Sequence, residues 1–329
     1  MEKKKTEPFL QVEDLVVRYT AGDEVIEAVN GVSFTLDRGE TIGLVGETGA
    51  GKTTIVKSIL RILPDVSARV ESGRVVFDGQ ELFGLSEKQM RKIRGKQIAM
   101  IFQDPMTALN PVFTVGDQIS EALRLHQKMS KKEAFTRACE MLEMVGIPPE
   151  RYSEYPHQFS GGMKQRVVIA MALSCNPSLL LADEPTTALD VTIQAQVLEM
   201  MNRLKRELGT SLIMITHDLG IVAEVCDRVA VVYAGEIVEM GTREHIFDNG
   251  MHPYTEGVFD SIPSLTGDET RLKPIRGLPP NPADLPKGCK FAPRCPYATE
   301  ACHANRQELR EVEEGHWVRC HRERGGAGA

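Results

Sequence analysis

The sequence predicts an α/β fold built around a mostly parallel sheet, and three observations lead to that class. The apolar run at 41–45 is followed by a glycine-rich turn at 46–53, and helical spacing begins at 54. The segment 176–232 alternates strand and helix patterns, which is typical of a parallel core. With 329 residues, the chain has room for one large α/β domain and a small appendage.

The remaining elements follow in chain order. Residues 9–36 and 70–83 predict short β segments of an antiparallel subdomain, the second with Asp78-Gly79 as its turn. Residues 116–146 have helical spacing that breaks at 146–149, which predicts a helical subdomain over about 104–165. We expect the main domain to span 1–250 and a C-terminal extension to span 251–329.

The turn at 46–53 fits the phosphate-binding pattern G-x-x-x-x-G-K-[ST]. Its glycines let backbone N–H groups converge on phosphate oxygens, and the following helix start adds its positive dipole end. Lys52 is expected to reach the β- and γ-phosphates, and the Thr53 hydroxyl to bind Mg²⁺. The alternative is a chance match in a glycine-rich turn. The predicted nucleotide contacts here are Gly46, Glu47, Thr48, Gly49, Ala50, Gly51, Lys52, Thr53 and Thr54.

A second apolar strand, 179–182, ends in two acids, Asp183 and Glu184. Open α/β sheets place their ligand sites at such carboxyl ends. Asp183 is therefore expected to hold Mg²⁺, and Glu184 to act as general base toward the attacking water. The alternative is a solvated acidic turn before Pro185.

Three further side chains leave strand-like runs. His217 is expected to hydrogen-bond the γ-phosphate, or else to cap the helix that begins near Asp218. Gln103 is predicted to contribute to catalysis and to the Mg²⁺ shell, the alternative being a surface glutamine. Tyr19 can stack on adenine, or serve as a core aromatic.

In their order, these motifs resemble the nucleotide-binding subunits of ABC transporters over residues 8–245. The resemblance implies a P-loop (RecA-like) ATPase core, and it identifies Ser160-Gly161-Gly162 as the signature and Asp190 as part of the D-loop. It also implies a head-to-tail dimer in which each ATP contacts the phosphate loop of one chain and the signature of the other. A serine N-cap with glycines at a helix start presents free N–H groups to such an anion.

Several stretches resemble one branch of that family, the dipeptide, oligopeptide and nickel importers, and most closely their D-type subunit. They are 103–111, 155–159, 252–255 and 277–282. The branch implies a second ATPase subunit, identical or related, two integral membrane permease subunits and, indirectly, an extracytoplasmic substrate-binding protein. Peptide is the expected substrate, with nickel chelates or sugars as alternatives. A soluble ABC ATPase with no role in transport is the competing class.

The C-terminal extension 251–329, called the tail below, contains four cysteines in a segment rich in proline and charge: Cys289, Cys295, Cys302 and Cys320. Their spacing, C-x5-C-x6-C-x17-C, matches neither a common zinc finger nor the bacterial ferredoxin run. The resemblance to D-type subunits implies a [4Fe–4S] cluster on these four thiolates. Zn²⁺ is the alternative, with His303, His316 and His321 as substitute ligands. Two disulfides are the third reading, and a tail without a metal is the fourth.

Composition limits the partners. The formal net charge is −7 and no basic face dominates, which argues against nucleic acid. The N-terminal residues lack the apolar segment that a signal peptide needs, so none is expected, and no apolar run approaches the ~18–20 residues of a membrane span. Membrane contact is therefore expected through partner subunits, with this chain peripheral on the cytoplasmic face of the cell membrane.

Overall fold

The computed structural model describes residues 7–187, 189–261 and 274–322. The chain divides into two compact units, and each is described by itself. The first unit contains Leu36–Thr41 and Gly84–Thr216. The second contains Phe9–Thr35, Ile42–Phe83 and the chain from His217 onward.

Parallel strands form the centre of the first unit, in the order β8-β7-β6. All residues of β7 (Leu179–Asp183) and β8 (Ser211–Ile215) are buried, as their continuous apolar sequences require in a sheet covered on both faces. β6 (Ile98–Ile101) pairs with β7 from Ile98 opposite Leu179. The helices of this unit are α2 (Glu87–Ile93), α3 (Pro105–Ala108), α4 (Val115–Gln127), α5 (Lys131–Met144), η1 (Pro149–Ser153), η2 (Pro156–Gln158), α6 (Gly161–Leu173) and α7 (Val191–Leu208).

The helical spacing predicted over 116–146 resolves into two helices, α4 and α5, with a break between them that the sequence analysis did not identify. Lys128 ends α4 in the left-handed conformation. Ser130 then opens α5 with a capping box, in which its hydroxyl accepts from the Glu133 N–H while the Glu133 carboxylate accepts from the Ser130 N–H. The Ser-x-x-Glu pattern was present in the sequence and predicts this break.

The predicted antiparallel subdomain is present in the second unit as a sheet of order β2-β1-β4-β5. The strands are β1 (Leu10–Ala21), β2 (Glu24–Leu36), β4 (Ala68–Phe77) and β5 (Gln80–Glu81). Asp78 and Gly79 join β4 to β5 with φ of 50° and 76°. Two positive φ values are typical of the type I′ hairpin turn that Asp-Gly favours.

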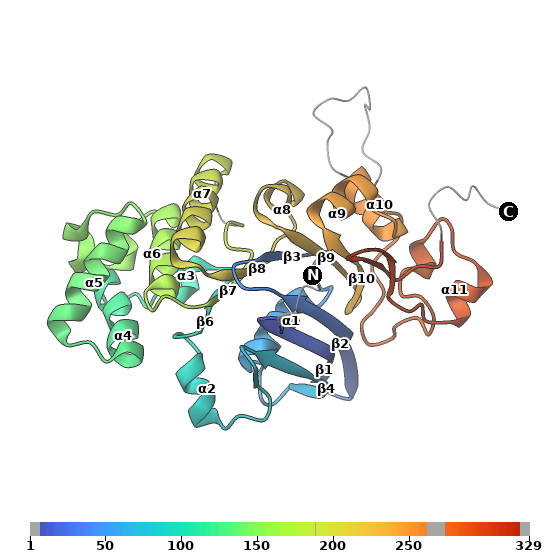
Figure 1. The fold of residues 1–329 in the computed structure, drawn as a ribbon, viewed down its shortest axis with the longest axis horizontal. Coiled ribbons are helices and arrows are strands. Elements are labelled where there is room, and N and C mark those ends of the chain that lie inside the picture. Colours follow the sequence, from blue (N-terminus) through green and yellow to red (C-terminus); the bar gives the residue numbers. More distant parts are fainter. Residues whose placement is uncertain (1–6, 188, 262–273, 323–329) are drawn as a thin grey trace, which may run out of the picture. The chain divides into compact units, whose positions relative to one another are not determined.

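The other strands of the second unit follow the order β11-β12-β10-β9-β3. β3 (Thr41–Val45) and β9 (Arg228–Tyr233) are parallel, whereas β10 (Glu236–Thr242) is antiparallel to both β9 and β12 (His316–Val318). The tail strands β11 (Arg310–Glu313) and β12 thus extend the sheet beside β10 (Figure 1). The helices of this unit are α1 (Lys52–Leu60), α8 (Leu219–Val225), α9 (Arg243–Asn249), α10 (Pro253–Asp260), η3 (Ala292–Arg294) and α11 (Glu300–Ala304).

Candidate functional site

The glycine-rich turn joins β3 to α1 and lies tightly against neighbouring backbone. A Cβ on Gly46 would stand 2.1 Å from the Val232 carbonyl oxygen, and one on Gly51 would stand 2.3 Å from the Ala28 carbonyl oxygen. Both glycines also have positive φ, 151° and 102°. The loop therefore requires glycine at both glycine positions of the pattern, because any other residue would push the loop off β9 and β2.

Lys52 lies buried across this loop. Its Nζ donates to the Gly46 carbonyl at 2.7 Å and to the Glu47 carbonyl at 2.9 Å, which holds a positive charge over the turn. On α1, the Thr54 hydroxyl lies 3.3 Å from the hydroxyl of Tyr19 on β1. The second unit thus brings together the predicted adenine-stacking aromatic and the phosphate loop, with Thr48, Gly49, Ala50 and Thr53 in the same loop and helix start.

The acidic strand end belongs to the first unit. Asp183 is the last residue of β7 and is 4% exposed. Glu184 follows with φ of 47°, and its N–H donates to the Ile215 carbonyl of β8. Its Oε2 accepts from Gln103 Nε2 and from the Thr187 hydroxyl, both at 2.9 Å. The two predicted catalytic side chains Gln103 and Glu184 are therefore in direct contact.

The serine-glycine segment begins a helix, as predicted. Ser160 N-caps α6 by accepting from the Met163 N–H, and Ser160 and Gly161 are exposed. A Cβ on Gly162 would stand 2.5 Å from the Ile193 side chain at the start of α7. Asp190 caps α7 by accepting from the Ile193 N–H at 3.0 Å. The N-terminal ends of these two helices therefore lie together.

His217 begins the last segment of the second unit and lies two residues before α8. The capping alternative for this residue is not used, because Asp218 is the N-cap and accepts from the Gly220 and Ile221 N–H groups. The predicted residues thus fall into two sets. Gln103, Asp183, Glu184, Asp190 and Ser160–Gly162 lie in the first unit, and Tyr19, Gly46–Thr54 and His217 lie in the second.

Sequence reasoning missed two residues that hold the phosphate loop. The hydroxyl of Tyr254 on α10 accepts from the Glu47 N–H at 2.9 Å, and the guanidinium of Arg294 in η3 pairs with the Glu47 carboxylate. Burial raises the pKa of Tyr254, and hydrogen bonding to Glu47 raises the pKa of Arg294, so the first stays neutral and the second charged. An acid inside an anion-binding loop was the available signal, because such a charge needs a cation nearby.

The four tail cysteines are free thiols that lie close enough to influence one another. Burial raises the pKa of Cys295 to about 11, and the neighbouring Cys320, Cys289 and Cys302 add to the rise. Burial also raises the pKa of Cys289, and the backbone of Phe291 and Ala292 offsets part of that rise. The Arg322 N–H donates to the Cys320 sulfur at 3.5 Å. Within the described ranges, however, no group of three or more His, Cys, Asp or Glu converges as a metal site. The predicted metal centre is therefore not supported by the side chains as they stand.

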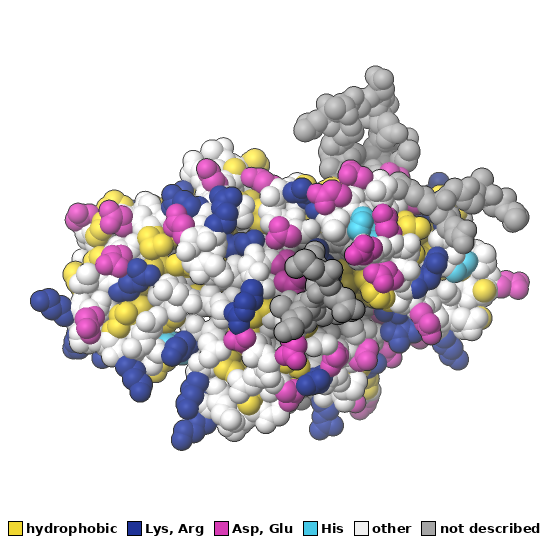
Figure 2. All heavy atoms as spheres, in the orientation of Figure 1, with side chains coloured by type: hydrophobic (Ala, Val, Ile, Leu, Met, Phe, Trp, Pro, Cys, Tyr) yellow, Lys and Arg dark blue, Asp and Glu magenta, His cyan; other side chains and the backbone are white. Residues whose placement is uncertain are grey.

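The surface carries charges of both signs. Figure 2 shows Lys and Arg side chains interspersed with Asp and Glu on the face in view. None of the helices in the described parts of the chain is long and apolar enough to cross a membrane.

Comparison with known families gives two matches. Residues 29–187 match the ABC transporter family, and residues 238–302 match the C-terminal region of oligopeptide/dipeptide transporters. The second region covers α10, η3 and the first three tail cysteines.

Similar individual proteins agree with these two family matches. The chain is 55% identical to the dipeptide transport ATP-binding protein DppD of Bacillus subtilis, over 90% of this chain and 89% of that one. It is 52% identical to the oligopeptide transport ATP-binding protein OppD of Haemophilus influenzae, over 90% and 91%. Among solved structures, the ATP-binding cassette MJ0796, a dimer in a post-hydrolysis state bound to ADP and Pi, matches with a TM-score of 0.64 and 28% identity, over 71% of this chain and 98% of that one.

Proposed function

The chain belongs to the ATP-binding subunits of ABC transporters, and from that premise we propose that it hydrolyses ATP to drive the uptake of di- and oligopeptides through a membrane importer. One observation carries the substrate class: the match to the oligopeptide/dipeptide transporter C-terminal region extends the ATPase match. Import of nickel chelates or sugars by the same ATPase is the alternative.

We assign the ATP chemistry to the following residues. Lys52, already fixed over the loop, binds the β- and γ-phosphates, and Tyr19 stacks on adenine. Thr53, Gln103 and Asp183 offer a hydroxyl, an amide and a carboxylate, the oxygen donors that Mg²⁺ prefers. Mg²⁺ held by these donors would supply positive charge to offset that of the triphosphate.

Glu184 is assigned as the general base that activates the attacking water. His217 is assigned to orient the γ-phosphate. Gln103 Nε2 donates to Glu184 Oε2, so the amide fixes the direction of the carboxylate before substrate arrives. The positive φ of Glu184 supports this assignment, since strained backbone at a non-glycine residue is concentrated at functional sites.

In the proposed mechanism, a second ATPase subunit is needed to close over the bound ATP. We propose that Ser160-Gly161-Gly162 contacts the ATP held by a second ATPase subunit, identical or related, in a head-to-tail dimer that includes Asp190. The exposed N-terminus of α6 supports this proposal, because its free N–H groups suit an anion that its own chain does not hold.

We propose that this chain contacts the membrane subunits through a groove of about 540 Å³ in the helical part of the first unit. Its apolar side chains Phe113 and Phe135 are 53% and 50% exposed, and apolar side chains gathered on one part of a surface mark sites of protein contact. We propose that the two membrane permease subunits insert here, which would place the chain peripherally on the cytoplasmic face. The groove is lined by Phe113, Asp117, Gln118, Ser120, Glu121, Arg124, Lys131, Phe135 and Tyr152.

We also propose that the four tail cysteines hold a [4Fe–4S] cluster, with Zn²⁺ as the alternative. Two observations support this ligation: the four thiols are near enough to shift one another's pKa, and the Arg322 N–H donates to the Cys320 sulfur at 3.5 Å. The four sulfur atoms would have to converge further to hold the cluster. Anaerobic purification tests the proposal: broad absorption near ~400 nm with about four irons and four sulfides per chain supports the cluster. Stoichiometric zinc in a colourless protein assigns the site to zinc.

Transport decides the main proposal. In a strain lacking this chain, uptake of labelled di- and oligopeptides should fall, and it should return with the wild-type chain but not with Glu184→Gln. Two membrane subunits should co-purify with the chain. Unchanged peptide uptake would refute the substrate class, and co-purification with ribosomes or DNA would favour a soluble ATPase with no role in transport.

A further inference from the structure

One arginine of the tail, Arg294, forms an ion pair with the phosphate loop. Arg294 lies in η3, immediately before Cys295. Its Nη1 donates to Glu47 Oε2 at 2.8 Å and its Nη2 to Glu47 Oε1 at 2.9 Å. The Arg294 side chain is 5% exposed and that of Glu47 is 30% exposed. This is a bidentate pair, the geometry that gives an arginine–carboxylate contact both strength and direction.

The carboxylate of Glu47 lies in a loop that is suited to bind an anion, where a negative side chain is unfavourable. It directly follows Gly46 in a loop whose N–H groups and Lys52 suit an anion. An uncompensated carboxylate there would repel a bound triphosphate. Arg294 neutralises that charge, and the Tyr254 hydroxyl, which accepts from the Glu47 N–H, fixes the backbone of the same residue.

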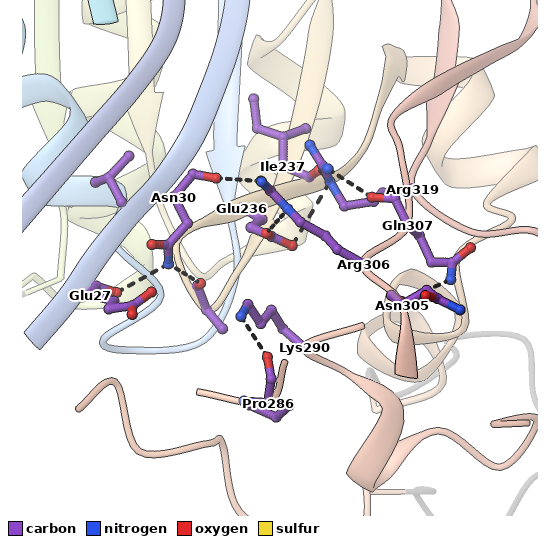
Figure 3. Close-up of polar contacts among 12 residues, drawn as sticks. Glu27, Asn30, Glu236, Ile237, Pro286, Lys290, Asn305, Arg306, Gln307 and Arg319 are labelled. Carbon is purple, nitrogen blue, oxygen red and sulfur yellow. Dashed lines mark hydrogen bonds and ion pairs between the residues drawn. The ribbon is translucent and has the colours of Figure 1, made fainter. Parts of the chain in front are cut away.

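A second arginine of the tail, Arg306, is linked to Ala50 of the loop through a series of hydrogen bonds. Arg306 Nη2 donates to the Asn30 carbonyl at 2.6 Å, and its Nε lies 2.7 Å from buried Glu236, as Figure 3 shows. The Asn30 N–H donates to the Gly235 carbonyl, and the Gly235 N–H donates to the Ala50 carbonyl. The tail therefore contacts the loop directly at Glu47 and, through these hydrogen bonds, at Ala50.

We propose that Arg294 is a positioning residue for ATP: by neutralising and orienting Glu47 it keeps the phosphate loop able to accept a triphosphate, so the cysteine-containing tail must be folded for ATP to bind tightly. This inference rests on the proposed assignment of Gly46–Thr53 as the nucleotide site. Because the contact acts on ground state and transition state alike, its loss should raise the KM for ATP and leave kcat nearly unchanged.

The test compares three purified full-length variants with the wild type, by titration with a fluorescent ATP analogue and by ATPase kinetics. Arg294→Met should weaken nucleotide binding and raise KM about tenfold, with kcat within about twofold, because a freed carboxylate then faces the phosphates. The double variant Arg294→Met/Glu47→Gln should regain most of that affinity. The control Arg322→Met breaks another tail ion pair, to Glu256, and should behave as wild type.

Three outcomes would overturn the proposal: unchanged nucleotide affinity in Arg294→Met, a fall in kcat with KM unchanged, or a double variant no better than the single one. If Arg294→Met does not fold, Arg294→Lys serves instead, because it keeps the charge but loses the bidentate geometry; affinity equal to wild type then refutes the positioning role. A wild-type chain that binds no nucleotide would instead refute the ATP site itself.

Discussion

Buried His252 should make the stability of this protein sensitive to acid. The side chain is 1% exposed, and its Nδ1 accepts from the Tyr254 N–H at 3.1 Å, capping α10. The His252 N–H donates to buried Glu239. Burial lowers the pKa of His252 to about 4, since a charged imidazole would lose its water and repel the N–H it now accepts.

The direction and magnitude of the change in unfolding free energy with pH follow from this pKa. Between the ordinary value of 6.5 and about 4, the unfolded chain binds a proton at this histidine that the folded chain does not. Stability is therefore fully present above pH ~6.5 and falls as the pH drops. One pKa unit corresponds to about 1.4 kcal/mol, so this histidine should remove about 2 kcal/mol of unfolding free energy between pH ~7.5 and ~5.

The assay is urea denaturation at several pH values across that interval, on wild type and His252→Asn. Asparagine keeps an oxygen that can cap α10 but does not titrate, so the variant should lose less stability on acidification, by about 2 kcal/mol. His157→Asn, at an exposed position, serves as the control and should keep the wild-type slope. Equal slopes for His252→Asn and wild type would show that His252 is not buried as a neutral group.

Three other changes test the site and the fold. Gly46→Ala places a methyl 2.1 Å from the Val232 oxygen and should abolish binding of a fluorescent ATP analogue; retained binding would mean that the loop shifts freely. Glu184→Gln should bind ATP normally but hydrolyse it at least ~100-fold more slowly, and full ATPase activity would remove its assignment as base. Ser130→Ala deletes the cap of α5 and should cost ~1 kcal/mol in denaturation, whereas no change would show that the capping box adds nothing.

The parts that sequence could predict are those fixed by local patterns. The turn at 78–79, the cap at Ser160 and the buried strand ending at Asp183 each depend on residues within one turn or one strand. The α/β fold followed from these, and the ABC transporter match agrees with it. The break at 128–130 was equally local, but periodicity alone hid it, because both helices place apolar residues on the same 3.6-residue spacing.

The link between the tail and the phosphate loop lay beyond local reasoning. Glu47 and Arg294 are 247 residues apart, and the chain has 39 lysines and arginines from which a partner could come. The requirement for a cation was readable, since an acid in an anion-binding turn must be neutralised. The identity of that cation depended on β12 joining β10 and on η3 packing near Tyr233, neither of which leaves a periodic signal. A tail that looks like an appendage in sequence therefore packs against the glycine-rich loop 46–53, which it contacts through Tyr254 and Arg294.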